Sequence, residues 1–421
     1  MLDRTHASKR LIGDTAPEVN GAPRDLRIDV CRGIALWWIF LDHVPNNLGS
    51  WLTPRNYGFC DAAEIFMFIS GVTCTLAYGR ACRREGWNGM IGRSLRRGWD
   101  IYAAFLLLTL ACTILVYLSG TDHLADVSNT RILFERPGAT IAHAAILQYR
   151  PVNTDVLPIF AIFHVLFAPL LWLLMRAPNV TLGLSLLLYA FVHVFGWSVP
   201  AWPNGVWFFN PLAWQLLIVL GGWCVIDGGK CRPWLTSRTA LVVAALYLVF
   251  SLMLSLSWEI KPLVFQTLAD SVFPLDKSNL SPLRLLHFLA LATVVLWLVP
   301  RSWKGLSSPV LHCAKLCGEN SLPIYCLGVV LALASHLTPL LISDLAVLQI
   351  AFSLAGILVM VIVGRLLNAT NKRALQPRST QSTGGECTGI LELAGREGAR
   401  REREGSAEGA RREPLAHSHN P

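Results

Sequence analysis

Arg32 and His43 stand eleven residues apart in one apolar segment, RIDVCRGIALWWIFLDHVPNNL (27–48). At about 100° per residue, eleven positions exceed three helical turns by roughly 20°, so both side chains would project from one helix face. A rise of about 1.5 Å per residue separates them by roughly 16 Å, about half the hydrocarbon thickness of a bilayer. Ionisable residues in membrane helices are costly and mark functional sites. A cation near one membrane surface and a base deeper in the same helix suit a reaction that joins two compartments.

His43 is the candidate general base, because histidine titrates near neutral pH and commonly moves protons in catalysis. Asp42 precedes it but points about 100° away around a helix. Glu64, in the stretch CDAAEIFMFISG, is expected at the outer start of the second apolar segment, where it shares a helix face with Asp61. We therefore expect Glu64 to orient His43 as a catalytic partner. Simpler interpretations stay open: a helix-end histidine bonded to a loop carbonyl, and a carboxylate favoured by the helix dipole.

Arg32 and a group of arginines after the second apolar segment are candidate donor-binding residues. The stretch RACRREGWNGMIGRSLRRGW contains six arginines, among which Arg93 shares a helix face with Arg96 and with Arg97. Arginine forks match phosphate oxygens, so we expect these three to contact a nucleotide or coenzyme A. Arg32 would be a fixed cation for the same ligand. Topology alone would explain most basic residues in this stretch, and Arg32 would otherwise snorkel or pair with a nearby aspartate.

Two later stretches add candidate substrate-binding residues. In PLDKSNLSPLRLLHF, Lys277 and Arg284 are expected to face an anionic or hydroxylated ligand at the outer surface, although they would also suit an ordinary polar loop. In GENSLPIYCLG, Ser321 and Tyr325 lie four residues apart and are placed to hydrogen-bond a ligand. Ser321, with a proline two residues later, would equally serve as a helix N-cap.

The elements that must position these residues are membrane helices. The 421 residues are 53% hydrophobic and 15% charged, with a mean hydropathy of +0.47, whereas soluble domains carry about 25% charged residues. This composition indicates an all-α, polytopic membrane protein. We predict about ten transmembrane helices, at 28–48, 60–78, 99–119, 156–175, 180–199, 207–226, 238–257, 283–299, 320–338 and 346–366.

The distribution of basic residues predicts the orientation. Outside the tail, 18 lysines and arginines fall in the segments assigned to the inside and 7 in the outer loops, which places both termini in the cytoplasm. We expect a cytoplasmic segment at 1–27, a membrane domain at 28–366 and a disordered cytoplasmic tail at 367–421. The long outer loops 120–155 and 258–282 are candidate lids or acceptor surfaces. The net charge of +9 reflects topology, so no nucleic-acid partner is expected.

Several familiar chemistries find no support in the sequence. There is neither a P-loop nor a Gly-rich dinucleotide fingerprint, and no G-x-S-x-G nucleophile elbow. The eleven cysteines are scattered, mostly in apolar segments, and indicate small buried side chains rather than a disulfide framework. We expect no metal site and no resident cofactor.

Together the motifs resemble the membrane acyltransferase 3 superfamily. Arg32 and His43 match its Arg-x10-His pattern, and Phe68 to Gly71 looks like its Phe-x-Ser-Gly segment. The arginines before the third span and the segment from Ser321 to Tyr325 are also similar to that superfamily. Within it, the quoted stretches look like the OpgC-like branch, which succinylates osmoregulated periplasmic glucans. The resemblance covers about residues 24–366.

The resemblance implies an O-acyltransferase of the bacterial inner membrane. Its donor would be a cytoplasmic acyl-CoA, with succinyl favoured over acetyl, and its acceptor a hydroxyl of a periplasmic glucan or another extracytoplasmic glycan. By resemblance, His43 is the base, Arg32 binds the donor, and Arg93 and its neighbours contact the coenzyme A phosphates. Direct transfer needs no covalent intermediate; a two-step route would use Ser70 or His43 itself.

Two other classes of protein remain open at this point. Intramembrane Arg, His and Glu also serve proton relays and anion paths, so a transporter or flippase for a glycan precursor or small anion is the main alternative. Such proteins usually show repeated halves, and no convincing repeat is visible here. A membrane assembly partner without catalysis would leave the alignment of Arg32 with His43 unexplained. The oligomeric state and the role of the tail stay open.

Overall fold

The computed structural model describes residues 25–45, 47–259, 266–337 and 345–375. Regular structure in these residues is helical, and the one strand-like pairing there is an isolated bridge between Pro200 and Val206. The all-α prediction is therefore confirmed for the described chain. Packing divides the chain into residues 1–369 and residues 370–421. Nearly all of the predicted N-terminal segment and of the predicted tail lies outside the described residues.

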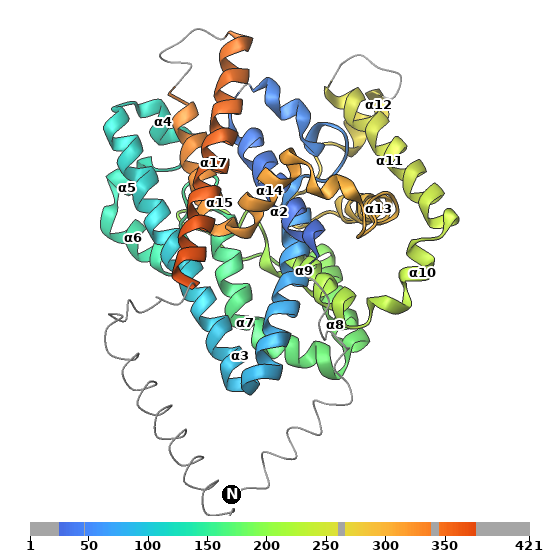
Figure 1. Cartoon of the computed structure of the whole chain (residues 1–421). Helices are drawn as coiled ribbons and strands as arrows, with labels where there is room; N and C mark the ends of the chain where they lie inside the picture. Colours follow the sequence, from blue (N-terminus) through green and yellow to red (C-terminus); the bar gives the residue numbers. More distant parts are fainter. Residues whose placement is uncertain (1–24, 46, 260–265, 338–344, 376–421) are drawn as a thin grey trace, which may run out of the picture. The chain divides into compact units, whose positions relative to one another are not determined.

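In the described part of the chain, ten longer helices form the body of the fold, and shorter helices lie in the loops (Figure 1). The longer helices are α2 (Leu26–His43), α3 (Ala62–Ser119), α7 (Val156–Arg176), α8 (Pro178–Phe195), α9 (Pro211–Ile226), α11 (Arg238–Glu259), α13 (Pro282–Leu298), α14 (Pro309–Glu319), α15 (Ser321–Ser335) and α17 (Ala346–Leu375). The shorter ones are η1 (Leu48–Leu52), η2 (Pro54–Asn56), α4 (Asp122–Val127), α5 (Arg131–Glu135), α6 (Pro137–Ala145), η3 (Gly228–Lys230), α10 (Arg232–Leu235), α12 (Gln266–Val272) and η4 (Lys304–Ser307).

By length and composition, five helices in the described residues can cross a membrane: α3, α7, α8, α11 and α17. The pair α14 and α15, bent by 99°, adds a sixth if it counts as one broken span, and α9 and α13 are shorter apolar helices. The chain is thus a membrane protein, while the count of ten spans stays a prediction. Helix α2, which carries four charged residues, is not among the five.

Helix α3 contains the second and third predicted spans and reverses direction between them. Gly86 has a φ of +74°, outside helical geometry, and a glycine adopts it without steric cost. Contacts of the first arm advance along α7, whereas those of the second arm run back along it: Phe66 with Phe160, Tyr78 with Phe167, Ser94 with His164 and Gly98 with Ala161. The two arms are therefore antiparallel (Figure 1).

Glycines allow the helices around the candidate motifs to approach closely, as small residues do in membrane bundles. A Cβ on Gly33 of α2 would lie 1.7 Å from the carbonyl oxygen of Ala314 of α14. A Cβ on Gly71 of α3 would lie 2.2 Å from the carbonyl oxygen of Ile218 of α9. These crossings hold α2 and the first arm of α3 in fixed positions within the bundle.

Candidate active site

The first polar cluster begins where α3 starts. Asp61 is the N-cap: its carboxylate accepts a hydrogen bond from the Ala63 amide at 2.8 Å, and Glu64 accepts one from the Asp61 amide at 3.0 Å. This reciprocal pair is a capping box, which satisfies the free amides of the first turn. Asp61 and Glu64 share a helix face, as the sequence predicted.

A buried ion network connects this helix start to α13. The Arg284 guanidinium donates to Glu64 Oε1 at 2.7 Å and to Asp61 Oδ2 at 3.2 Å, while Lys277 Nζ lies 2.5 Å from Asp61 Oδ2. Glu64 is 0% exposed and Arg284 8%. Two cations therefore match two carboxylates, which offsets much of the cost of burying them. The structure brings three of the predicted site residues, Glu64, Lys277 and Arg284, into one cluster.

The loop that carries Lys277 is fixed by buried aromatic residues. The Trp214 indole donates to the carbonyl oxygens of Lys277 and Ser278, both at 3.1 Å, and the Tyr189 hydroxyl donates to Leu280 at 2.7 Å. The Lys277 ammonium also lies 5.5 Å from the ring centroid of Phe208, within cation–π range. The position of this cation is thus set by α8 and α9, far from it in the sequence.

His43 is the last residue of α2 and is partly exposed. Its Nδ1 lies 2.5 Å from the carbonyl oxygen of Ile39. Because a carbonyl only accepts, Nδ1 carries the proton and Nε2 presents its lone pair. Lys277 and Asp61 are among its electrostatic neighbours. Glu64, in contrast, makes its contacts in the described structure with Asp61 and Arg284, so the Ile39 carbonyl performs the orienting role that the sequence suggested for Glu64.

The loop after α2 contributes two residues that the sequence reasoning missed. The Thr53 hydroxyl donates to Asp42 at 2.6 Å, which ties the 3₁₀ turns η1 and η2 to the end of α2. Arg55, two residues later, is exposed and is an electrostatic neighbour of both Asp42 and His43. Within the described residues Arg55 makes no ion pair. A polar loop directly after a motif helix was the only sequence signal for it.

A second pair of residues borders the same region. Arg150 binds Asp155 at 3.0 Å and stacks over Trp207, with its guanidinium carbon 4.7 Å from the ring centroid. Asp155 precedes α7, and burial raises its pKa although Arg150 opposes this effect. Lys277 is an electrostatic neighbour of Asp155, so this pair adjoins the network at α3.

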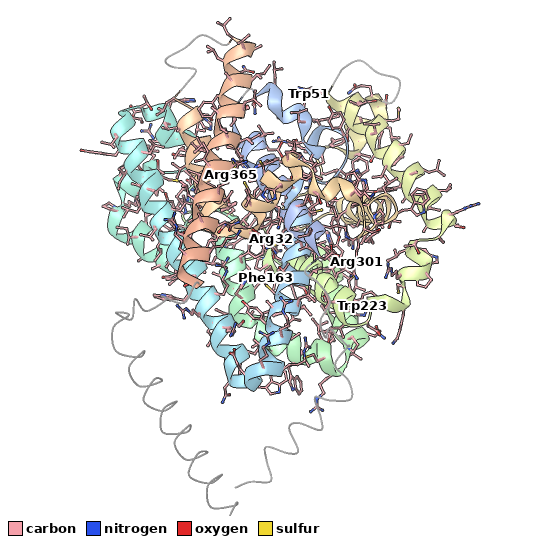
Figure 2. All side chains as sticks on the ribbon, viewed as in Figure 1. Arg32, Trp51, Phe163, Trp223, Arg301 and Arg365 are labelled. Carbon is pink, nitrogen blue, oxygen red and sulfur yellow. The ribbon has the colours of Figure 1, made fainter. Side chains whose placement is uncertain are left out.

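Arg32 lies eleven residues before His43 on α2, on the side that faces the first arm of α3. Its guanidinium donates to the Thr73 hydroxyl at 2.6 Å, while His43 is a neighbour of Asp61 at the start of the same arm. Arg32 therefore contacts the first arm of α3, while the hydrogen bond of His43 stays within α2. In Figure 2, Arg32 lies below Trp51, which belongs to the loop after the end of α2.

The three arginines after the bend lie in different surroundings. Arg93 is exposed and pairs with Glu85 just before Gly86. Arg96 lines an apolar groove with Trp99 and Tyr102. Arg97 is half-buried and is an electrostatic neighbour of Tyr78 in the bundle. Only Arg97 is thus placed inside the bundle, whereas Arg93 and Arg96 remain at its surface.

Ser321 and Tyr325 lie on α15, directly after the bend from α14. The N-cap position belongs to Asn320 rather than Ser321. The side-chain amide of Asn320 donates to the side-chain oxygen of Asn368 at 2.7 Å. The Tyr325 hydroxyl, deeply buried, donates to the carbonyl oxygen of Asn153 at 2.6 Å. Tyr325 therefore braces the segment before α7. The described part of the chain contains no group of three or more His, Cys, Asp or Glu side chains placed to hold a metal ion.

Comparison with known families gives one match. A family model described as OpgC protein matches residues 24–372, which is most of the chain and includes every site residue named above. No curated protein and no solved structure matches the chain.

Proposed function

Because the chain belongs to the OpgC protein family and is a membrane acyltransferase, we propose that it transfers a succinyl group from cytoplasmic succinyl-CoA to a hydroxyl of a periplasmic glucan. The bacterial inner membrane is the compartment boundary that this reaction requires. Acetyl-CoA as donor and another extracytoplasmic glycan as acceptor are the closest variants of the proposal. The lipid bilayer, the donor and the glycan are its partners.

The position of His43 carries the proposal. The His43 imidazole donates its Nδ1 hydrogen to the Ile39 carbonyl and keeps the lone pair of Nε2. Such a ring is suited to take a proton from a sugar hydroxyl. The resulting alkoxide attacks the thioester carbonyl, the carbon–sulfur bond to coenzyme A breaks, and the imidazolium returns its proton to the leaving thiolate. Lys277, which is held by Asp61 and interacts electrostatically with His43, would stabilise the charge on the carbonyl oxygen.

The network around Arg284 supports a positioning role rather than direct substrate binding. Its guanidinium is engaged by both Glu64 and Asp61 and is buried. We propose that Glu64 and Arg284 hold Asp61, which in turn holds Lys277 close to His43. Preorganised charge of this kind loses no energy to rearrangement during the reaction.

Arg32, on the same face of α2 as His43, supports a donor that reaches outward from the cytoplasm. By helical rise it lies roughly 16 Å from His43. The phosphopantetheine arm would span this interval, with the coenzyme A phosphates near Arg93, Arg96 and Arg97. Arg55, an exposed cation in the loop after α2 that interacts electrostatically with His43, supports succinyl over acetyl, because a cation in this loop suits the second carboxylate of a succinyl group.

One observation favours a transporter instead. Helices α14 and α15 meet at 99°, and broken helices form the central sites of many transporters. Mass spectrometry of periplasmic glucans from cells with and without the gene separates these functions. A mass increment of one succinyl group, present only with the gene and lost with His43→Ala, supports the transferase. An unchanged acylation pattern on glucans and surface polysaccharides would refute it and favour transport.

A further inference from the structure

A thiol and an imidazole face each other inside the bundle, away from the network at Asp61. Cys74 Sγ on the first arm of α3 lies 3.5 Å from His164 Nε2 on α7. His164 Nδ1 lies 2.9 Å from the carbonyl oxygen of Phe160. As at His43, the carbonyl requires the proton to be on Nδ1, so Nε2 accepts from the Cys74 thiol.

Two arginines from other elements converge on this pair. Arg32 of α2 donates to Thr73, the neighbour of Cys74, and both Arg32 and Arg97 are electrostatic neighbours of Cys74 and His164. The cluster therefore draws on α2, both arms of α3, and α7. Polar and charged groups gathered inside a membrane domain are costly unless they serve a ligand or one another.

Part of the cluster is exposed. His164 is buried, but Arg32, Thr73 and Cys74 are each partly exposed. Thr73 lies twelve residues along α3 from Asp61, a rise of roughly 18 Å. The polar surface at Thr73 and Cys74 is thus well separated from the network at Asp61, at about the level where Arg32 precedes His43 on α2.

We infer that Thr73, Cys74 and His164 line the passage of the donor's phosphopantetheine arm, with Arg32 beside it. This inference rests on the proposed function and names the donor's path within it. The arm carries amides and a hydroxyl, which need hydrogen-bond partners when they leave water. The Thr73 hydroxyl, which donates to the Ile69 carbonyl and accepts from Arg32, and the Cys74 sulfur, which donates to His164, keep acceptor lone pairs for such groups at the partly exposed edge of the cluster. Cys74 contacts the arm in this arrangement and forms no bond with the acyl group.

Thiol labelling of the full-length protein tests the inference. In a variant that retains Cys74 as its only cysteine, the rate of reaction with N-ethylmaleimide is measured with and without S-ethyl-coenzyme A, a thioether that has no free thiol. At about ten times its Kd, occupancy of the site should slow labelling roughly tenfold. The matched control retains only Cys224, which is also partly exposed but lies on α9, and its rate should not change.

Kinetics supply a second readout that does not depend on labelling. Cys74→Trp should raise the KM for succinyl-CoA with little effect on the KM for the glucan. His164→Ala should raise the donor KM more than it lowers kcat. Cys224→Trp controls for the bulk of an added indole.

The outcomes separate this inference from the proposed function. If calorimetry shows that the thioether binds but Cys74 is labelled at an unchanged rate, the passage runs elsewhere and the acyltransferase proposal still stands. If the folded protein does not bind the thioether at all, both the passage and the coenzyme A donor are refuted.

Discussion

Arg284 donates to Glu64 at 2.7 Å although 220 residues separate them in the chain. This bond joins the start of α3 to the start of α13 and is buried at both ends. It fixes the two helix starts at the candidate site directly, without the loops between those helices. Lys277, seven residues before Arg284, is brought to Asp61 by the same junction.

His43→Ala should lower the transfer rate by about 10²–10⁴-fold, the usual contribution of a positioned base. The variant should stay folded, because His43 is partly exposed at a helix end. Acylated glucan per milligram of purified protein is the measurement, with thermal unfolding as the check on folding. His123→Ala, at an exposed histidine in α4, is the control. Normal acylation by the His43 variant would remove the proposed base.

Arg284→Met should destabilise the protein by about 3–5 kcal/mol, because it leaves the buried Glu64 carboxylate without its cation. Glu64→Gln combined with Arg284→Met should restore part of that loss, since one unpaired charge is then removed. A double-mutant cycle on denaturant unfolding in detergent measures the coupling. Arg131→Met, at an exposed ion pair with Asp126, should change stability little. Additive effects at Glu64 and Arg284 would contradict the role of the pair.

Arg55→Gln should weaken the use of succinyl-CoA roughly tenfold or more, the effect of losing one charge-assisted hydrogen bond. Acetyl-CoA, which has no second carboxylate, should be used as well as before. The ratio of kcat/KM for the two donors is the measurement. Equal decreases in kcat/KM for both donors would mean that Arg55 does not recognise the acyl group.

Gly71→Ala should destabilise the crossing of α3 with α9 by about 1–3 kcal/mol, because the added methyl would overlap the Ile218 carbonyl. Gly92→Ala is the matched control on the second arm, where nothing lies within 4 Å of the new Cβ. That control should raise stability by about 0.5–1 kcal/mol through backbone entropy. Equal thermal stability of the two variants would show that the close approach is not required.

Helical periodicity was enough to predict the shared face of Arg32 and His43 and that of Asp61 and Glu64, because both depend only on local spacing. The partner of Glu64 was not predictable, since the sequence carries no record of which distant cation reaches it. The same limit applies to Tyr325, whose hydroxyl donates to the backbone carbonyl of Asn153.

Helix ends and bends were less accessible to sequence reasoning. Gly86 lies in a basic polar stretch that indicated a connection, and the structure reduces this connection to a single non-helical residue. All three candidate arginines follow this bend on the second arm of α3, where Arg93 binds Glu85 across the bend and Arg97 is half-buried in the bundle. Their surroundings differ because different helices pack against each part of this arm, which hydropathy does not reveal.

The Asp61 carboxylate has two structural roles, and a substitution at this position changes both of them. Its one carboxylate both starts α3, through the Ala63 amide, and anchors Lys277 and Arg284. A substitution there would loosen the helix and misplace both cations in the same event. Relatives with a different acyl preference would therefore diverge in the turn that carries Arg55 and keep the acid itself in place.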